Sequence, residues 1–242
     1  MGRKTTIGGA LVAGLAALLI ASAARADSSE ERDARALREA REQIAGLQKR
    51  GANEAAFVPR GWSIEDRAEA DLDADASADK VLVLLQDERE DVDRHRALLV
   101  LLHRNGSFLR GGNNFGLLPC WGCTGMKGGH GEPNLKVKRG VLLIDQFGGS
   151  RNVYGSLQRF RWSRSRERFE LIGKDTLLED SADGSSTKTS CNLLTLRCEK
   201  TVTPPLIDGD GNEVDQKRIT TKYQLPKQEM STLEQAVFFN GD

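Results

Sequence analysis

The 242-residue sequence is poor in several kinds of residue, and each shortage excludes a class of protein. It contains only three His, and aromatic residues make up 5% of the chain. Basic and acidic side chains number 35 each, so neither sign of charge is in excess. A chain without net positive charge does not attract polyanionic DNA or an anionic membrane surface by charge alone. Nucleic acid is therefore not an expected partner.

Recognisable catalytic motifs are also missing from the sequence. There is no HExxH zinc motif, no phosphate-binding P-loop and no GxSxG nucleophile motif. The three histidines, His95, His103 and His130, do not adjoin a Ser or Cys in a nucleophile pattern. We therefore predict no catalytic residue, although residues distant in sequence can still meet in a fold.

The one hydrophobic run of near-spanning length lies at the N-terminus. Positive residues precede the uncharged run 7–24, and Ala24-Arg25-Ala26 places small residues at a cleavage position. We predict a signal peptide over residues 1–26, and a membrane anchor is the alternative because the run approaches spanning length. Cleavage removes Arg3, Lys4 and Arg25, which leaves 32 basic against 35 acidic groups. The predicted location is the periplasm or the medium, with no membrane span after cleavage.

The segment after the predicted cleavage point has the pattern of a helix. Ser28 followed by Glu31 is typical of a capping box, and Gly51 is a natural stop after a run rich in Ala, Arg, Glu and Gln. Its apolar stripe is thin, so we expect the helix to lie on the surface of the domain or to pair with a partner, and a solvated lid or arm is favoured over a coiled-coil contact. The mature chain is accordingly divided into a helical arm, 27–52, and a single β domain, 53–242.

Beyond residue 61 the pattern changes to short apolar or alternating runs separated by turn residues, which is typical of antiparallel strands. Residues 81–85 form a continuous apolar run that suits a central strand. Five hairpins are predicted, the first around Asn105-Gly106; they pair 97–103 with 107–110, 135–138 with 141–144, 157–162 with 169–178, 187–192 with 196–202, and 205–207 with 218–225. The predicted fold class is all-β, an antiparallel meander of hairpins, propeller-like or a sandwich, preceded by one N-terminal helix.

Acidic residues are concentrated in the loop before the apolar run 81–85. Asp71, Asp73, Asp75 and Asp79 occupy loop positions one, three, five and nine, and the backbone carbonyl of Ser77 suits position seven. Alternate oxygen ligands of this kind are what Ca²⁺ requires, so we predict a calcium site with these five residues as ligands. Ala76 stands where such loops usually have Gly, and no Glu follows at position twelve, which argues against an EF-hand. The alternative is a solvated acidic turn.

The same region resembles a known family. The stretch 57–62, the acids of the loop and the apolar run 81–85 are similar to bacterial secreted proteins with FG-GAP or VCBS-type motifs, whose repeat is related to the integrin alpha-chain N-terminal propeller. The resemblance implies a DxDxDGxxD calcium loop that leads into a β-strand, with Asp71, Asp73, Asp75 and Asp79 as side-chain ligands. Further similarity to a group of single-domain proteins of this kind extends to about residue 225, through Asn113-Asn114, 141–150, 159–162 and 169–173. It implies no reaction.

The four cysteines form two local pairs, Cys120 with Cys123 and Cys191 with Cys198. An even count in an exported chain favours two disulfides. The second pair flanks a predicted hairpin turn, so pairing across the hairpin would staple it. Two alternatives stay open: four thiolates binding Zn²⁺, and a CxxC redox centre, which needs a thiolate stabilised at a helix start.

These observations favour an exported, non-enzymatic, calcium-stabilised β domain that binds a protein or a glycan at the cell envelope. One alternative is a secreted hydrolase with a site in the Gly-rich segment 120–130, where His130 would meet an acid. Another is an envelope redox or metal-handling protein. The sequence predicts no oligomeric state.

Overall fold

The fold was obtained as a computed structural model that describes residues 31–88, 93–207, 211–213, 215 and 217–239. The predicted signal peptide lies outside the described residues. Residues 31–45 are helical. The remaining elements are β1 (Arg50–Gly51), η1 (Glu54–Phe57), β2 (Trp62–Ala70), β3 (Asp79–Gln86), β4 (Arg96–Arg104), β5 (Ser107–Asn114), β6 (Asn134–Lys138), β7 (Val141–Gly149), β8 (Asn152–Ser163), β9 (Arg168–Asp180), β10 (Ser186–Asn192), β11 (Arg197–Thr203), β12 (Ile219–Gln224) and η2 (Leu233–Gln235).

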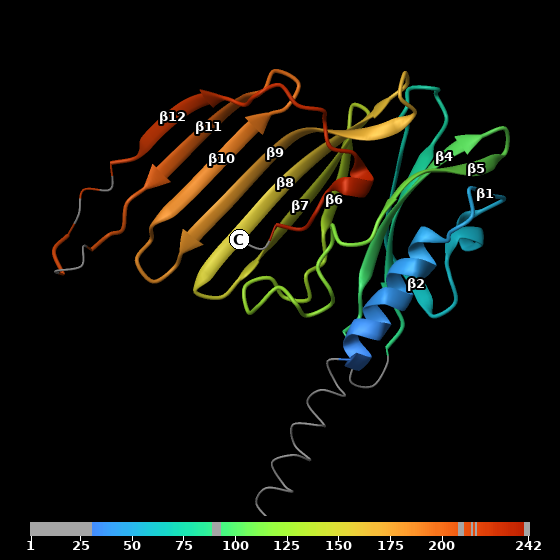
Figure 1. The fold of residues 1–242 in the computed structure, drawn as a ribbon, viewed down its shortest axis with the longest axis horizontal. Helices are drawn as coiled ribbons and strands as arrows, with labels where there is room; N and C mark the ends of the chain where they lie inside the picture. The colour runs from blue at the N-terminus through green and yellow to red at the C-terminus, as the bar shows by residue number, and fades with distance from the viewer. Residues whose placement is uncertain (1–30, 89–92, 208–210, 214, 216, 240–242) are drawn as a thin grey trace, which may run out of the picture.

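The strands form two antiparallel sheets that pack as a sandwich (Figure 1). The five-stranded sheet has the order β1-β5-β4-β3-β2, and the seven-stranded sheet has the order β12-β11-β10-β9-β8-β7-β6. Strands β10 to β12 extend beyond the five-stranded sheet, as Figure 1 shows. The predicted all-β class with one N-terminal helix is confirmed, and its architecture is a sandwich rather than a propeller.

Two apolar clusters lie on opposite faces of the five-stranded sheet. One fills the space between the sheets and includes Val81 and Val83, and the other lies under the helix and includes Leu82 and Leu84. Side chains of a strand point alternately to its two faces, so β3 must be apolar at successive positions to serve both clusters. This requirement explains the continuous run 81–85, and β4 shows the same pattern over 97–102.

The N-terminal helix packs on the outer face of the five-stranded sheet. Ala36, Ala40 and Ile44, spaced four residues apart, are 7%, 0% and 1% exposed. The helical segment ends at residue 45, where Gly46 donates a hydrogen bond to the carbonyl of Glu42. The helix is therefore shorter than predicted, since it ends at residue 45 instead of about residue 50. It lies on the surface of the domain, as expected, but these three residues dock it on the sheet instead of leaving it a solvated arm.

Four of the five predicted hairpins are present, with registers close to those expected. The turns Asn105-Gly106 and Arg139-Gly140 have positive φ at both residues, 50° and 76° in the first and 54° and 72° in the second. These values suit tight hairpin turns of the primed type. The fifth prediction is wrong in its partner, because β12 pairs with β11 instead of residues 205–207. Part of that connection lies outside the described residues.

The C-terminal segment closes one side of the sandwich. Asn114, at the end of β5, donates from Nδ2 to the carbonyl of Leu233 at 2.6 Å and to that of Ala236 at 2.8 Å. The amide of Leu171 in β9 donates to the carbonyl of Ser231 at 2.8 Å. Since Leu233 is fully buried, this segment ties the two sheets together.

Candidate functional site

The acidic loop connects β2 to β3 and is shaped by its own carboxylates. Oδ1 of Asp71 accepts a hydrogen bond from the amide of Asp75 at 3.1 Å, and Oδ2 accepts one from the amide of Ala76 at 3.0 Å. Oδ1 of Asp75 accepts from the amide of Ser77 at 2.8 Å. Ala74 and Ala76 have φ of 61° and 68°, a left-handed conformation that favours glycine. The chain is thus wound tightly enough to turn several aspartates toward one point.

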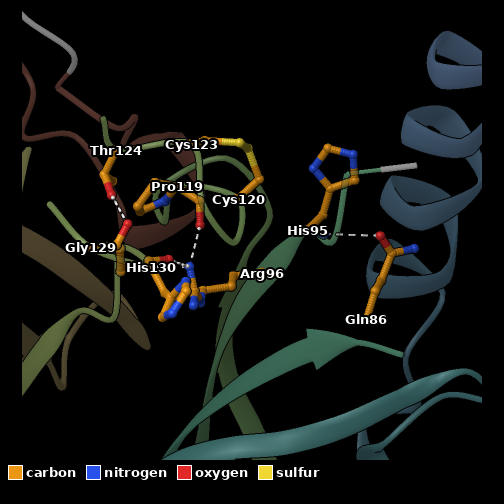
Figure 2. The surroundings of a disulfide bond; sticks show 10 residues. Gln86, His95, Arg96, Pro119, Cys120, Cys123, Thr124, Gly129 and His130 are labelled. Carbon is orange, nitrogen blue, oxygen red and sulfur yellow. Dashed lines mark hydrogen bonds between the residues drawn. A yellow bond between two sulfur atoms is a disulfide. The ribbon is translucent and has the colours of Figure 1, made fainter. Parts of the chain in front are cut away.

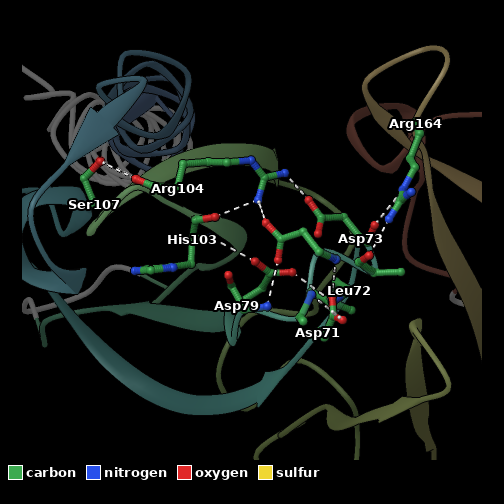
Figure 3. A network of polar contacts seen from close by, with 12 residues as sticks. Asp71, Leu72, Asp73, Asp79, His103, Arg104, Ser107 and Arg164 are labelled. Carbon is green, nitrogen blue, oxygen red and sulfur yellow. Dashed lines mark hydrogen bonds and ion pairs between the residues drawn. The ribbon is translucent and has the colours of Figure 1, made fainter.

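Three of the predicted ligands meet in this loop (Figure 3). One carboxylate oxygen each from Asp71, Asp73 and Asp79 lies within 4.8 Å of the others. Asp73 is 5% exposed and Asp79 is 0% exposed. Hard oxygen ligands gathered at this spacing are suited to a divalent cation, and water can complete its coordination.

Asp79 joins the loop to the neighbouring strand. Its Oδ2 accepts from the amide of Leu72 at 2.8 Å, and its Oδ1 accepts from the amide of His103 in β4 at 2.8 Å. Burial raises the pKa of this carboxyl group above its ordinary value, and the negative charges of Asp73 and Asp75 act in the same direction. Repulsion among the carboxylates therefore adds to burial in raising the pKa of Asp79, which is the most buried of the three.

Two arginines that the sequence reading missed flank the cluster (Figure 3). Arg104 at the end of β4 forms ion pairs with Asp73 and with Asp75, the latter at 2.7 Å. Arg164, in the turn after β8, donates from Nε to the carbonyl of Asp73 at 2.9 Å and from a terminal nitrogen to the carbonyl of Ala74. No local spacing reveals these contacts, because the partners lie about thirty or ninety residues apart in sequence.

The arginines leave one carboxylate oxygen of the cluster without a partner. Oδ1 of Asp73 is buried and makes no hydrogen bond, although its sister oxygen Oδ2 binds Arg104. A buried charged oxygen without a partner is costly, and a bound cation is one way to satisfy it. The donor set therefore fits a divalent cation at Asp71, Asp73 and Asp79. Asp75 lies against Arg104, and the amide of Ser77 donates to Asp75.

A groove crosses one face of the seven-stranded sheet, over strands β8 to β11. Tyr154, Leu178, Thr187 and Val202 are direct cross-strand neighbours on β8, β9, β10 and β11. They line a groove with a volume of about 540 Å³, in which Leu178 and Val202 are 36% and 37% exposed. Polar side chains of the lining cluster where these strands end or begin; they are Asn152, Glu179, Asp180, Ser185, Ser186 and Thr203. The groove thus combines an apolar floor with a polar margin.

Both cysteine pairs are joined as predicted. Cys120 is bonded to Cys123, and Cys191 is bonded to Cys198. The second pair occupies directly opposed positions of β10 and β11, so it staples the hairpin as the sequence suggested. A four-cysteine zinc centre is not formed, because each cysteine is bonded to its local partner.

The histidines lie in three different surroundings. The ring of His130 is stacked on that of Trp121 with centroids 3.8 Å apart, and both residues are exposed. The ring of His95 makes an edge-to-face contact with that of Phe115, and the ring of His103 makes one with that of Phe108. His130 therefore has an aromatic neighbour where the hydrolase alternative required an acid in a cleft.

Among the described residues, no helix is long and apolar enough to cross a membrane. Comparison of the whole chain with family models, with curated proteins and with solved structures gave no match in any of the three.

Proposed function

We propose that this chain is an exported, non-catalytic β-sandwich module that binds Ca²⁺ in the acidic loop and a neutral glycan in the groove of the larger sheet. The single observation that carries the calcium part is the buried, unpartnered Oδ1 of Asp73 beside Asp71 and Asp79. The resemblance of the loop to a DxDxDGxxD motif supports the same proposal.

Charge arithmetic also favours a divalent ion in the loop. The four carboxylates of the loop lie near two guanidinium groups, that of Arg104, which pairs with Asp73 and Asp75, and that of Arg164, which binds backbone carbonyls. Glu167 lines the same pocket, so at least two formal negative charges are left over, and one divalent cation would offset two of them. Asp71, Asp73 and Asp79 would hold the ion, and Arg104 would keep Asp75 in place beside it. The ion would relieve the repulsion that opposes ionisation of Asp79.

The groove favours a glycan over other ligands of similar size. Its apolar floor at Leu178 and Val202 suits the C–H faces of sugar rings, and its amide, hydroxyl and carboxylate groups suit sugar hydroxyls. The lining, all of it within the described part of the chain, includes Glu179 and Asp180 and neither Lys nor Arg. Asp180 is paired with Arg151 at 2.9 Å, so the lining offers no unpaired cation to an anionic ligand, and we assign the groove to a neutral oligosaccharide.

Export is supported by the predicted signal peptide and by the two disulfide bonds. Two disulfides persist in an oxidising compartment and are rare where glutathione keeps thiols reduced. The periplasm or the medium is therefore the proposed location, and the envelope is where a glycan ligand would be met.

Thermal unfolding of chelator-treated protein, with and without Ca²⁺, tests the loop. At a free concentration one hundred times Kd, one bound ion adds about 2.7 kcal/mol to the free energy of unfolding. For a chain of this size, we expect Tm to rise by about 5–11 °C. Asp73→Asn should abolish the rise, while Asp145→Asn, an exposed carboxylate on β7, should keep it. An unchanged Tm in Ca²⁺ would overturn the calcium part.

Binding of immobilised neutral oligosaccharides tests the groove. Leu178→Asp should abolish retention, because it places a charge on the apolar floor at a partly exposed position where folding tolerates it. Phe147→Ser is the matched control, since Phe147 is an exposed apolar residue, 48% accessible, outside the groove. Retention that survives Leu178→Asp, or the absence of retention by any neutral glycan, would contradict this assignment.

A further inference from the structure

The Cys120–Cys123 pair lies in a turn whose geometry suits more than a disulfide. The amide of Cys123 donates to the carbonyl of Cys120 at 3.2 Å, and Gly122 between them has φ of 80°. This is a β-turn in which glycine supplies the positive φ at its third position. Such a turn directs both sulfur atoms to one side. The carboxylate of Asp93 lies on that side, with one of its oxygens and both sulfurs within 4.8 Å of one another.

The turn is held in place by contacts that do not involve the sulfur–sulfur bond (Figure 2). The fully buried side chain of Arg96 donates to the carbonyls of Pro119 at 3.1 Å and His130 at 2.9 Å. The amide of Trp121 donates to the carbonyl of Arg94 at 2.9 Å, one residue from Asp93. These bonds hold Pro119 and Trp121, at the start of the turn, against β4 and the residues before it, and the amide of Gly122 donates to the carbonyl of His130 at 3.1 Å. Opening the disulfide would therefore leave the two thiols and the carboxylate close together.

The two disulfides differ in their access to a reductant. Cys123 is exposed and Cys120 is partly exposed, whereas Cys198 is 4% exposed and its bond to Cys191 bridges directly paired strands. Thiol–disulfide exchange requires a thiolate to reach a sulfur atom, so the exposed bond is the one that opens first.

We propose that Cys120, Cys123 and Asp93 form a redox-gated site for Zn²⁺, closed as the disulfide and open as the dithiol. A dithiol reductant opens it: the donor gives two electrons and two protons and becomes a disulfide, while the Cys120–Cys123 bond breaks to two thiols. Binding of Zn²⁺ then displaces both thiol protons. Two thiolates and one carboxylate give three protein ligands, and water takes the fourth tetrahedral position.

This site is independent of the acidic loop and of the groove. It draws on Asp93, which precedes β4, and on the segment after β5, whereas the calcium proposal draws on the loop between β2 and β3. Thiolates are soft ligands that select zinc over calcium, while carboxylate and carbonyl oxygens select calcium. The two proposals can therefore fail separately.

The test measures Zn²⁺ affinity of the full mature chain by competition with a chromophoric chelator, after reduction with a phosphine and in the oxidised state. We expect the reduced chain to bind one Zn²⁺ at least about tenfold more tightly than the oxidised chain, and Asp93→Asn to weaken it by about tenfold or more. Co²⁺ in place of Zn²⁺ should give sulfur-to-cobalt charge-transfer absorption, which a carboxylate site cannot give.

Paired variants provide the controls. Replacing Cys120 and Cys123 together with Ser should abolish the redox-dependent binding and the cobalt signal, whereas the same change at Cys191 and Cys198 should leave both in place. Circular dichroism of the reduced chain should match that of the oxidised chain, because the hydrogen bonds to the turn remain. Equal Zn²⁺ affinity in the two redox states, binding that survives loss of Cys120 and Cys123, or unfolding on reduction would each overturn the proposal.

Discussion

Replacing Ala76 with Gly should stabilise this protein, because the loop forces an alanine into a conformation that suits glycine. Ala76 has φ of 68°. The left-handed conformation costs a residue with a β-carbon about 1–2 kcal/mol, and glycine does not bear this cost. Glycine in turn gives the unfolded chain more freedom, which takes back about 0.4–1 kcal/mol. The difference between the midpoints of these two ranges is an expected net gain of about 0.8 kcal/mol in the free energy of unfolding.

Thermal unfolding in chelator-containing buffer measures this gain without any contribution from a bound ion. A change of 1 kcal/mol moves Tm by about 2–4 °C in a chain of this size, so Ala76→Gly should raise Tm by about 1–4 °C. Ala78→Gly is the matched control, because Ala78 is exposed, lies in the same loop and does not have a positive φ. It should lower Tm slightly. A fall in Tm with Ala76→Gly, or equal changes in the two variants, would refute the reasoning.

Three further predictions address packing, charge and the hairpin staple. Ile44→Ala should lower the free energy of unfolding by about 2–5 kcal/mol in denaturant titrations, because Ile44 is 1% exposed against the five-stranded sheet; a loss below about 0.5 kcal/mol would mean that the helix is a solvated arm. Burial opposes ionisation of Asp175, yet the hydrogen bond from Arg159 helps to leave its pKa below the ordinary value. The pair should therefore add less than about 1 kcal/mol to the free energy of unfolding at neutral pH, and this contribution should be lost as pH falls through the lowered pKa. Denaturant titrations should accordingly give Arg159→Gln a lower free energy of unfolding than the parent at pH 7 and the same value in acid. Replacing Cys191 and Cys198 together with Ser should cost about 2.5 kcal/mol, the chain-entropy value for an eight-residue loop, and a neutral result in calorimetry would contradict the staple.

The strands and most hairpins of this fold were predictable because their signals are local. Asn105-Gly106 and Arg139-Gly140 mark tight turns between apolar runs, and each occurs where expected. The helix was harder to interpret, since its docking depends on Ala36 and Ala40. Small residues of this kind contribute little hydrophobicity, and their burial depends on a sheet surface that the sequence does not display.

The candidate site was predicted only in part, because only some of its residues are close together in sequence. Regular spacing identified Asp71, Asp73 and Asp79, whose positions follow from one short loop. Arg104 and Arg164 escaped notice because they reach the loop from another strand and from the opposite sheet. Their charges decide how much of the acidic cluster is left for a cation, so the net charge of the site became visible only with the fold.

The cation site in the acidic loop is the central claim, and calorimetric titration of chelator-treated protein with Ca²⁺ tests it most directly. We expect one bound Ca²⁺ per chain in the parent protein and none in Asp73→Asn, because the unpartnered oxygen of Asp73 completes the set of ligands with Asp71 and Asp79. Absence of binding heat at millimolar Ca²⁺, or the same affinity in parent and Asp73→Asn, would contradict it.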